Sequence, residues 1–192
     1  MAEAFQVGFV VLFGLGLVGT IAGYLRFRSH RGALEAKVGP LPTPGPVVVT
    51  AVALVVLVTR VGEVAAGWPL LRLIGVGLGV YALLVVPLAV RVLGRQGVPG
   101  IGVLRDHALV TSGPYQHVRH PGYSGVVALW LGAALATLNG LLLALWPLLI
   151  VGLLKVAREE ERLLHAKFGS AYAAYARRTG RFVPRLRRPQ PA

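Results

Sequence analysis

The segment 106–125 carries an unusual density of side chains that could do chemistry. It holds three of the five histidines of the chain, His107, His117 and His120, together with Arg119, two tyrosines and three glycines. Histidine exchanges a proton near neutral pH, and arginine pairs with carboxylates and phosphates. Glycines also free backbone N–H groups to approach an anion. The segment therefore predicts a binding site for an anionic or polar ligand rather than a plain connector.

Three consecutive glutamates, Glu159 to Glu161, begin a second polar stretch. Apolar and aromatic side chains then recur every three or four residues: Leu164, Phe168, Tyr172 and Tyr175. This period predicts an amphipathic helix over 158–184. Glu160 is in phase with the apolar face, whereas Glu159 and Glu161 point to either side. We interpret Glu160 as a functional carboxylate and Glu161 as a surface group that pairs with His165.

The pattern argues against metal and nucleic-acid chemistry. His117 and His120 are three residues apart, but Arg119 lies between them and Pro121 ends the pair, so no metal site is predicted. The chain has no cysteine, which excludes thiolate ligands, disulfides and a cysteine nucleophile. A net charge of +13 would suit an anionic polymer, but we find no motif that reads nucleic acid.

The composition indicates what must hold these groups in place. The 192 residues are 55% hydrophobic and only 14% charged, and the mean hydropathy is +0.68. A water-soluble domain of this size could not bury so much apolar surface. The sequence therefore predicts an integral membrane protein.

Five apolar stretches are predicted to cross the membrane: 5–25, 47–66, 70–90, 123–138 and 140–154. The dipeptide Asn139-Gly140 is typical of turns, so the last two stretches should form a tight helical hairpin. The expected fold is an all-α integral membrane protein with five transmembrane helices and a cytoplasmic C-terminal amphipathic helix. We treat 1–192 as one domain, in which 1–94 supplies three spans and 95–192 supplies the polar loop, the hairpin and the C-terminal helix.

The basic residues predict an orientation. Every lysine and arginine except Arg60 and Arg72 falls on one side of a five-span arrangement. The positive-inside rule then places the N-terminus outside and the C-terminus, with both polar stretches, in the cytoplasm. The expected location is the cell membrane, crossed several times, with membrane lipids as partners. No obligate protein partner is predicted, and Gly75, Gly77 and Gly79 should let helices approach closely.

Both polar stretches match the motifs of one family. The first reads Asp106-His107-x-Leu109-Val110-Thr111-x-Gly113-x-Tyr115 and then Arg119-His120-Pro121-x-Tyr123-x-Gly125. The second reads Glu160-Glu161-x-x-Leu164, then Phe168-Gly169-x-x-Tyr172-x-x-Tyr175, Thr179-Gly180-Arg181 and Pro184. In this order and spacing, the chain resembles the isoprenylcysteine carboxyl methyltransferases and their phospholipid methyltransferase relatives. The first 90 residues match only in being hydrophobic spans.

The resemblance implies a membrane methyltransferase that uses S-adenosylmethionine and releases S-adenosylhomocysteine, with the cofactor entering from the cytoplasm. With Arg119 added for its anion-binding chemistry, the implied cofactor-binding residues are His107, Ala108, Leu109, Val110, Tyr115, Arg119, His120, Pro121, Gly122, Tyr123 and Glu160. His120 and Glu160 are the catalytic candidates, because either could accept the proton that an amine acceptor loses. The expected acceptor is lipophilic: an isoprenylcysteine-type carboxylate on a prenylated molecule, a thiol or a lipid amine.

Two departures leave the acceptor open. The arginine that the family commonly has four residues before the glutamate matching Glu160 is Val156 here. A glutamine upstream of the His-x-Leu-Val segment is replaced by Gly100, and Gln96 is the nearest candidate. Two other functions fit part of the sequence: an NADPH-dependent membrane sterol-type reductase, whose C-terminal half is similar, and a non-enzymatic membrane scaffold.

Overall fold

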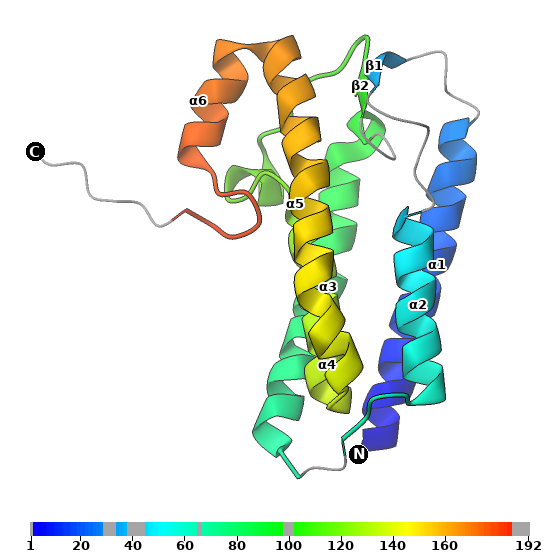
Figure 1. The fold of residues 1–192 in the computed structure, drawn as a ribbon. Coiled ribbons are helices and arrows are strands. Elements are labelled where there is room, and N and C mark those ends of the chain that lie inside the picture. The colour runs from blue at the N-terminus through cyan, green and yellow to red at the C-terminus, as the bar shows by residue number, and fades with distance from the viewer. Residues whose placement is uncertain (1, 29–33, 38–44, 65–66, 98–101, 186–192) are drawn as a thin grey trace, which may run out of the picture.

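The structure is a computed structural model that describes residues 2–28, 34–37, 45–64, 67–97 and 102–185. This part of the chain is mostly helical: α1 (Ala2–Arg28), α2 (Gly45–Thr59), α3 (Pro69–Leu93), α4 (Pro121–Thr137), α5 (Gly140–Phe168) and α6 (Ser170–Arg178), with the short 3₁₀ turns η2 (Gly94–Gln96) and η3 (Gly113–Gln116). α1 and α2 lie side by side, α3, α4 and α5 form a second group, and α6 folds back beside the end of α5 (Figure 1).

A two-stranded ribbon departs from the all-α expectation. β1 (Leu34–Lys37) pairs antiparallel with β2 (Gly102–Leu104), so that Leu34 lies opposite Leu104. The ribbon joins the loop after α1 to the chain just before the polar segment 106–125. It lies at the same end of the molecule as α6 (Figure 1).

Two helices among the described residues are long and apolar enough to cross a membrane, Pro69–Leu93 and Gly140–Phe168. The other apolar helical stretches are shorter: Glu3–Gly19, Val48–Thr59 and Pro121–Thr137. Each of the five expected spans coincides largely with a helix, but five crossings are not confirmed. The apolar stretch of α5 ends at Leu154, and the remainder of the helix, which includes Glu159 to Glu161, is rich in charge.

The expected single amphipathic helix over 158–184 is wrong. α5 continues without a break past 154 to Phe168, and the chain turns at Gly169, where φ is 52°. Glycine adopts this left-handed conformation at little cost. The apolar stripe is consequently divided, with Leu164 and Phe168 on α5 and Tyr172 and Tyr175 on α6.

The expected hairpin between the fourth and fifth apolar stretches is confirmed. α4 ends at Thr137, and Asn139 caps α5 by accepting a hydrogen bond from the N–H of Leu142 at 2.9 Å. The Asn139 side chain, 1% exposed, also donates to the carbonyl of Val61 at 3.0 Å. This one residue therefore ties the turn after α2 to the hairpin.

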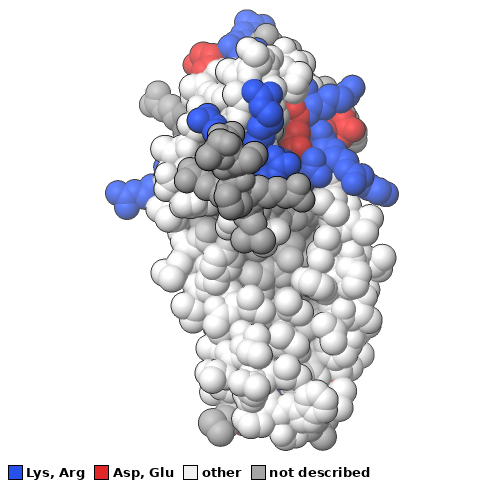
Figure 2. All heavy atoms as spheres, turned by 90° about the vertical axis from the view of Figure 1, so that its left-hand side faces the viewer, with Lys and Arg blue, Asp and Glu red and all other residues white. Residues whose placement is uncertain are grey.

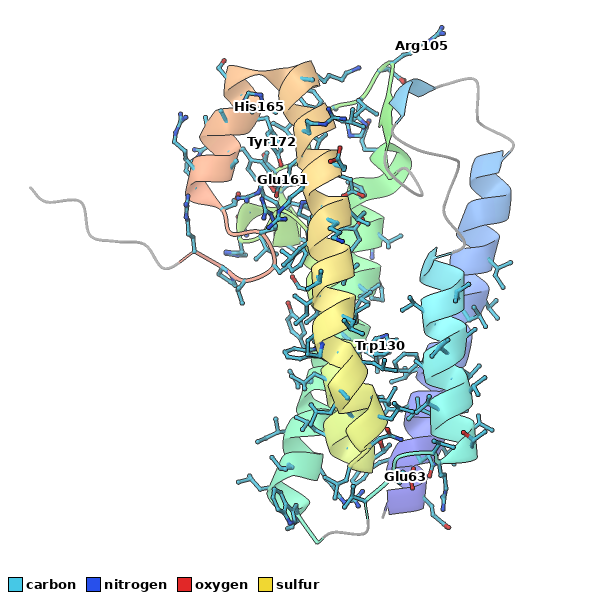
Figure 3. The ribbon with its side chains drawn as sticks, viewed as in Figure 1. Glu63, Arg105, Trp130, Glu161, His165 and Tyr172 are labelled. Carbon is cyan, nitrogen blue, oxygen red and sulfur yellow. The ribbon has the colours of Figure 1, made fainter. Side chains whose placement is uncertain are left out.

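The apolar core lies in the half of the molecule away from α6. Phe13 of α1 meets Trp130 of α4 edge to face, with ring centroids 6.0 Å apart, and Trp130 lies at the α1–α2 side of the second helix group (Figure 3). α3 and α4 pack closely through glycines: a Cβ on Gly75 would stand 2.4 Å from the backbone nitrogen of Ala136. Gly77 has open space instead, so only part of the expected glycine packing is present.

Candidate functional site

Charged side chains gather at one end of the molecule. Figure 2 shows lysine, arginine and acidic residues concentrated there, whereas the rest of the visible surface is almost free of charge. Glu161, His165 and Tyr172 lie together at this end, between α5 and α6 (Figure 3). The exposed basic residues of α5, α6 and the adjoining segments include Arg105, Lys155, Arg158, Arg162, Arg177, Arg178 and Arg185.

His120 lies between two neighbouring glutamates. Its Nδ1 is 3.3 Å from Oε2 of Glu160, and its Nε2 is 3.2 Å from Oε1 of Glu161. Burial alone would lower the pKa of His120, but the hydrogen bonds and charges of the two carboxylates outweigh it and raise the pKa above its ordinary value of 6.5. A ring that faces a carboxylate at each nitrogen donates at both, so the imidazolium form is favoured.

Glu161 is the centre of a partly buried ion-pair network. Its Oε1 accepts from Nε of Arg119 at 2.9 Å and Nε of Arg181 at 3.0 Å, and its Oε2 accepts from Nη2 of Arg181 at 2.6 Å. Burial would raise the pKa of Glu161, but hydrogen bonds from His120, Arg181 and Arg119 hold it well below its usual range. Glu161 is therefore a permanent anion at physiological pH.

Glu160 makes fewer contacts than Glu161. The hydroxyl of Tyr123 donates to its Oε1 at 2.5 Å. The Tyr123 ring stacks on His120 with centroids 5.3 Å apart, and Phe182 meets both rings edge-on. The Glu160 side chain is 21% exposed, against 14% for Glu161. Glu160 thus lies beside a cluster of aromatic rings and is the more exposed of the two carboxylates.

The segment after α6 holds the loop before α4 in place. The N–H of Arg119 donates to the carbonyl of Gly180 at 2.8 Å, and the N–H of His120 donates to the carbonyl of Arg181 at 3.1 Å. Gly180 is required by the turn of the segment itself, because a Cβ there would stand 1.7 Å from the carbonyl oxygen of Val183. The strap 179–182 and the loop 117–120 therefore form one unit.

The other expected cofactor residues lie around this unit. Pro121 is buried, Tyr115 is half-buried and donates to the carbonyl of Ala89 at 3.4 Å, and burial raises the Tyr115 pKa to about 12. Apart from its own turn of α4, Gly122 has no atom of the described residues within 4 Å of the position that a Cβ would occupy. Leu109 and Val110 are half-buried in the loop between β2 and η3.

His107 and Ala108 lie earlier in the same loop, and His107 is near the C-terminal end of α5. The His107 ring meets Phe168 edge-on at 5.9 Å, and burial, followed by the charge of Lys167, lowers the His107 pKa. The N–H of Ala108 donates to Oε1 of Gln96 at 3.0 Å, so Gln96 does reach the loop. Gly100 is outside the described residues.

The structure therefore brings His120, Tyr123 and Glu160 into direct contact. It places Arg119 differently from the expectation, because its guanidinium is occupied by Glu161 and by the carbonyls of Ala176 and Thr179. Sequence reasoning missed Glu161 and Arg181, and the expected pairing of Glu161 with His165 is replaced by the network described above. The Thr-Gly-Arg motif was the available signal for Arg181.

Among the described residues, no group of three His, Asp or Glu could hold a metal ion.

These features define a helical membrane protein with a polar site at its charged end. The chain matches the phospholipid methyltransferase family over residues 70–171, more than half of its length. It belongs to this family, within the isoprenylcysteine carboxyl methyltransferase-like group of membrane methyltransferases, and membership implies methyltransferase activity. A comparison with curated proteins gives no match.

Proposed function

We propose that this protein transfers a methyl group from S-adenosylmethionine to a lipophilic acceptor at the site around His120 and Glu160. The observation that carries the proposal is the contact of His120, Tyr123 and Glu160 at the end of long apolar helices, in a chain of the methyltransferase family. When bound, the cofactor would supply an electrophilic methyl group on a sulfonium ion.

The residues present fit such a cofactor. The Glu160 carboxylate can accept hydrogen bonds from an ammonium group. The first turn of α4 offers backbone N–H groups that favour a carboxylate, and the open space at Gly122 lies on that turn. The half-buried side chains of Leu109, Val110 and Tyr115 can cover the apolar parts of the molecule. His107, Ala108 and Pro121 complete the proposed binding set, and Arg119 supports it through Glu161.

Glu160 is the better candidate to accept a proton from the acceptor. His120 is held in its protonated form by two carboxylates, so it has no free lone pair to offer. Its proposed role is to hold Glu160 in place, together with Tyr123. The site needs no covalent nucleophile, because direct transfer depends mainly on holding donor and acceptor in line.

The surroundings of Glu160 favour a lipid amine among the three acceptors considered. Val156 lies one turn before Glu160 on α5 and supplies no charge, and Lys155 and Arg158 are exposed to solvent. The cation beside Glu160, His120, is already paired with Glu160 and Glu161, so the negative charge of Glu160 would repel a carboxylate acceptor and attract a protonated amine. The apolar side chains exposed on α1, α2 and α5, such as Val18, Val52 and Val151, suit lipid contact.

We further propose that the protein crosses the cell membrane five times, with the charged end in the cytoplasm. The exposed lysines and arginines of α5 and α6 lie at that end, as the positive-inside rule requires. S-adenosylmethionine would then reach the site from the compartment in which it is made.

Calorimetric titration of S-adenosylhomocysteine into the detergent-purified protein tests the function. Micromolar binding by the wild type and its loss in Glu160→Ala are expected. Glu159→Ala is the matched control, because the ion pair that Glu159 makes among the described residues is with Arg162, on the exposed face. A screen with labelled methyl groups over aminolipids, prenylcysteines and thiols would then identify the acceptor. Binding of NADPH in place of the product would favour the reductase, and binding of neither ligand by folded protein would favour the scaffold.

A further inference from the structure

The two neighbouring glutamates have different surroundings, which suggests that they do different work. Glu161 accepts four hydrogen bonds from Arg119, His120 and Arg181. Glu160 is contacted by the Tyr123 hydroxyl and the other nitrogen of His120. The less exposed carboxylate, with four hydrogen bonds, is suited to a supporting role, whereas the more exposed Glu160, with two contacts, can meet a ligand.

Arg181 controls the orientation of the Glu161 carboxylate. Its Nε and Nη2 contact Oε1 and Oε2 in the two-pronged arrangement that fixes a carboxylate in its plane. Arg119 and His120 both contact Oε1, and Arg181 is the partner of Oε2 among the described contacts. Without Arg181 the carboxylate could rotate away from Nε2 of His120.

Arg181 also holds His120 through its own backbone. The N–H of His120 donates to the carbonyl of Arg181, and the adjoining Phe182 ring meets the His120 ring edge-on at 6.1 Å. The same short strap therefore sets the position of the His120 backbone and, through Glu161, the angle of its ring.

We propose that Arg181 is a positioning residue: by holding both oxygens of Glu161, it keeps the His120 ring oriented so that Nδ1 faces Glu160. This inference rests on the proposed function, because it assigns Glu160 to the ligand and Glu161 to the support. It divides the Glu160-Glu161 pair into a ligand-facing carboxylate and a structural one.

The protonation of His120 distinguishes positioning from simple charge. The groups that face its ring are Glu160 and Glu161 from α5, Tyr123 from α4, and Arg119 and Arg181 from the loop and the strap, with Tyr115 beyond Glu160. If Arg181 acted only as a charge, its removal would raise the His120 pKa. If it positions Glu161, its removal releases the hydrogen bond to Nε2 and lowers that pKa.

The experiment uses the full chain in detergent micelles with isotope-labelled histidine, titrated by NMR. Arg181→Ala should lower the His120 pKa and weaken S-adenosylhomocysteine binding roughly tenfold, the size of one charged hydrogen bond. Arg181→Lys keeps the charge but loses the two-pronged contact, so it should also lower the pKa and should recover only part of the affinity. Arg162→Ala, which removes an exposed Arg–Glu pair on α5, is the matched control and should change neither.

A His120 pKa that rises or stays constant in Arg181→Ala overturns the inference. If that variant does not fold, Arg181→Lys decides by the same criterion. Failure of the wild type to bind S-adenosylhomocysteine would overturn the proposed function instead, and the histidine titration would still test whether Arg181 orients His120.

Discussion

Arg119 and Glu161 are 42 residues apart in the sequence and form an ion pair of 2.9 Å in which the two side chains are only 12% and 14% exposed. The pair joins the loop before α4 to the charged part of α5. Buried charges of this kind are costly to leave unpaired. The network around Glu161 therefore determines the stability of the site as well as its shape.

Replacement of Glu161 by Gln should destabilise the protein by about 3 kcal/mol, because it leaves Arg119 and Arg181 without their anion. Equilibrium unfolding in mixed micelles measures the loss. Glu159→Gln is the control, since the Glu159–Arg162 pair is 43% and 68% exposed and should contribute less than about 1 kcal/mol. Equal effects of the two substitutions would show that the Glu161 network is not a stabilising element.

The pH dependence of stability should have an acidic limb from Glu161. Its pKa in the folded protein is lowered from the ordinary value of 4.5, so its contribution is complete above pH 4.5 and is lost as the pH falls through the folded pKa. The thermal midpoint should therefore drop below pH 4.5 more steeply in the wild type than in Glu161→Gln. Parallel curves for the two proteins would contradict the assignment.

His120 should make the stability of the protein depend on pH in the opposite sense. Its pKa is raised above 6.5 in the folded state, so its contribution is complete below pH 6.5 and is lost as the pH rises through the folded pKa. The difference in thermal midpoint between the wild type and His120→Gln should shrink as the pH rises above 6.5. A difference that grows over this range would mean that the ring is neutral in the folded protein.

Much of the helical architecture could be predicted from the sequence, because apolar length and turn chemistry are local signals. The hairpin at Asn139 follows from a residue that caps one helix and ends another. The break at Gly169 was equally local, but the apolar stripe continued across it and concealed it. The pairing of β1 with β2 joins segments that are distant in the sequence, and no periodicity in the sequence indicates it.

The candidate site was predictable only in part. Helical phase selected Glu160, which does contact His120 and Tyr123. It could not select Glu161, because the partners of Glu161 arrive from a loop 42 residues earlier and a strap 20 residues later. Helical phase predicts which side of a helix a residue occupies. The role of a carboxylate also depends on which residues from other parts of the fold contact it.

The glycine contact between α3 and α4 gives a stability prediction. Gly75→Ala should destabilise by roughly 1–3 kcal/mol, because its Cβ would overlap the Ala136 backbone of α4. Gly77→Ala on the same helix should be neutral or slightly stabilising, since none of the described residues outside its own helix turn lies within 4 Å of the added carbon. Thermal unfolding in detergent compares the two, and equal stability would exclude the close approach of these helices.

The orientation of the chain can be checked with single cysteines, because the natural sequence has none. Gly67, between α2 and α3, and Ala171, on α6, are both exposed. In intact cells a membrane-impermeant maleimide should label Gly67→Cys, and it should label Ala171→Cys only after the membrane is opened. The reverse pattern would place the site outside the cell and remove its access to cytoplasmic cofactor.

The open space at Gly122 gives the most direct test of where the cofactor binds. Gly122→Ala adds one methyl group where, apart from the adjoining turn of α4, no described residue lies within 4 Å, so the folded protein should accept it with unchanged or slightly higher stability. If S-adenosylmethionine occupies that space, the same methyl group should weaken S-adenosylhomocysteine binding severalfold by steric overlap. Gly152→Ala is the matched control, because Gly152 also has open space but lies in the apolar stretch of α5, away from the site. Calorimetry with both variants separates the two effects, and full affinity in Gly122→Ala would mean that the ligand lies elsewhere in the charged end.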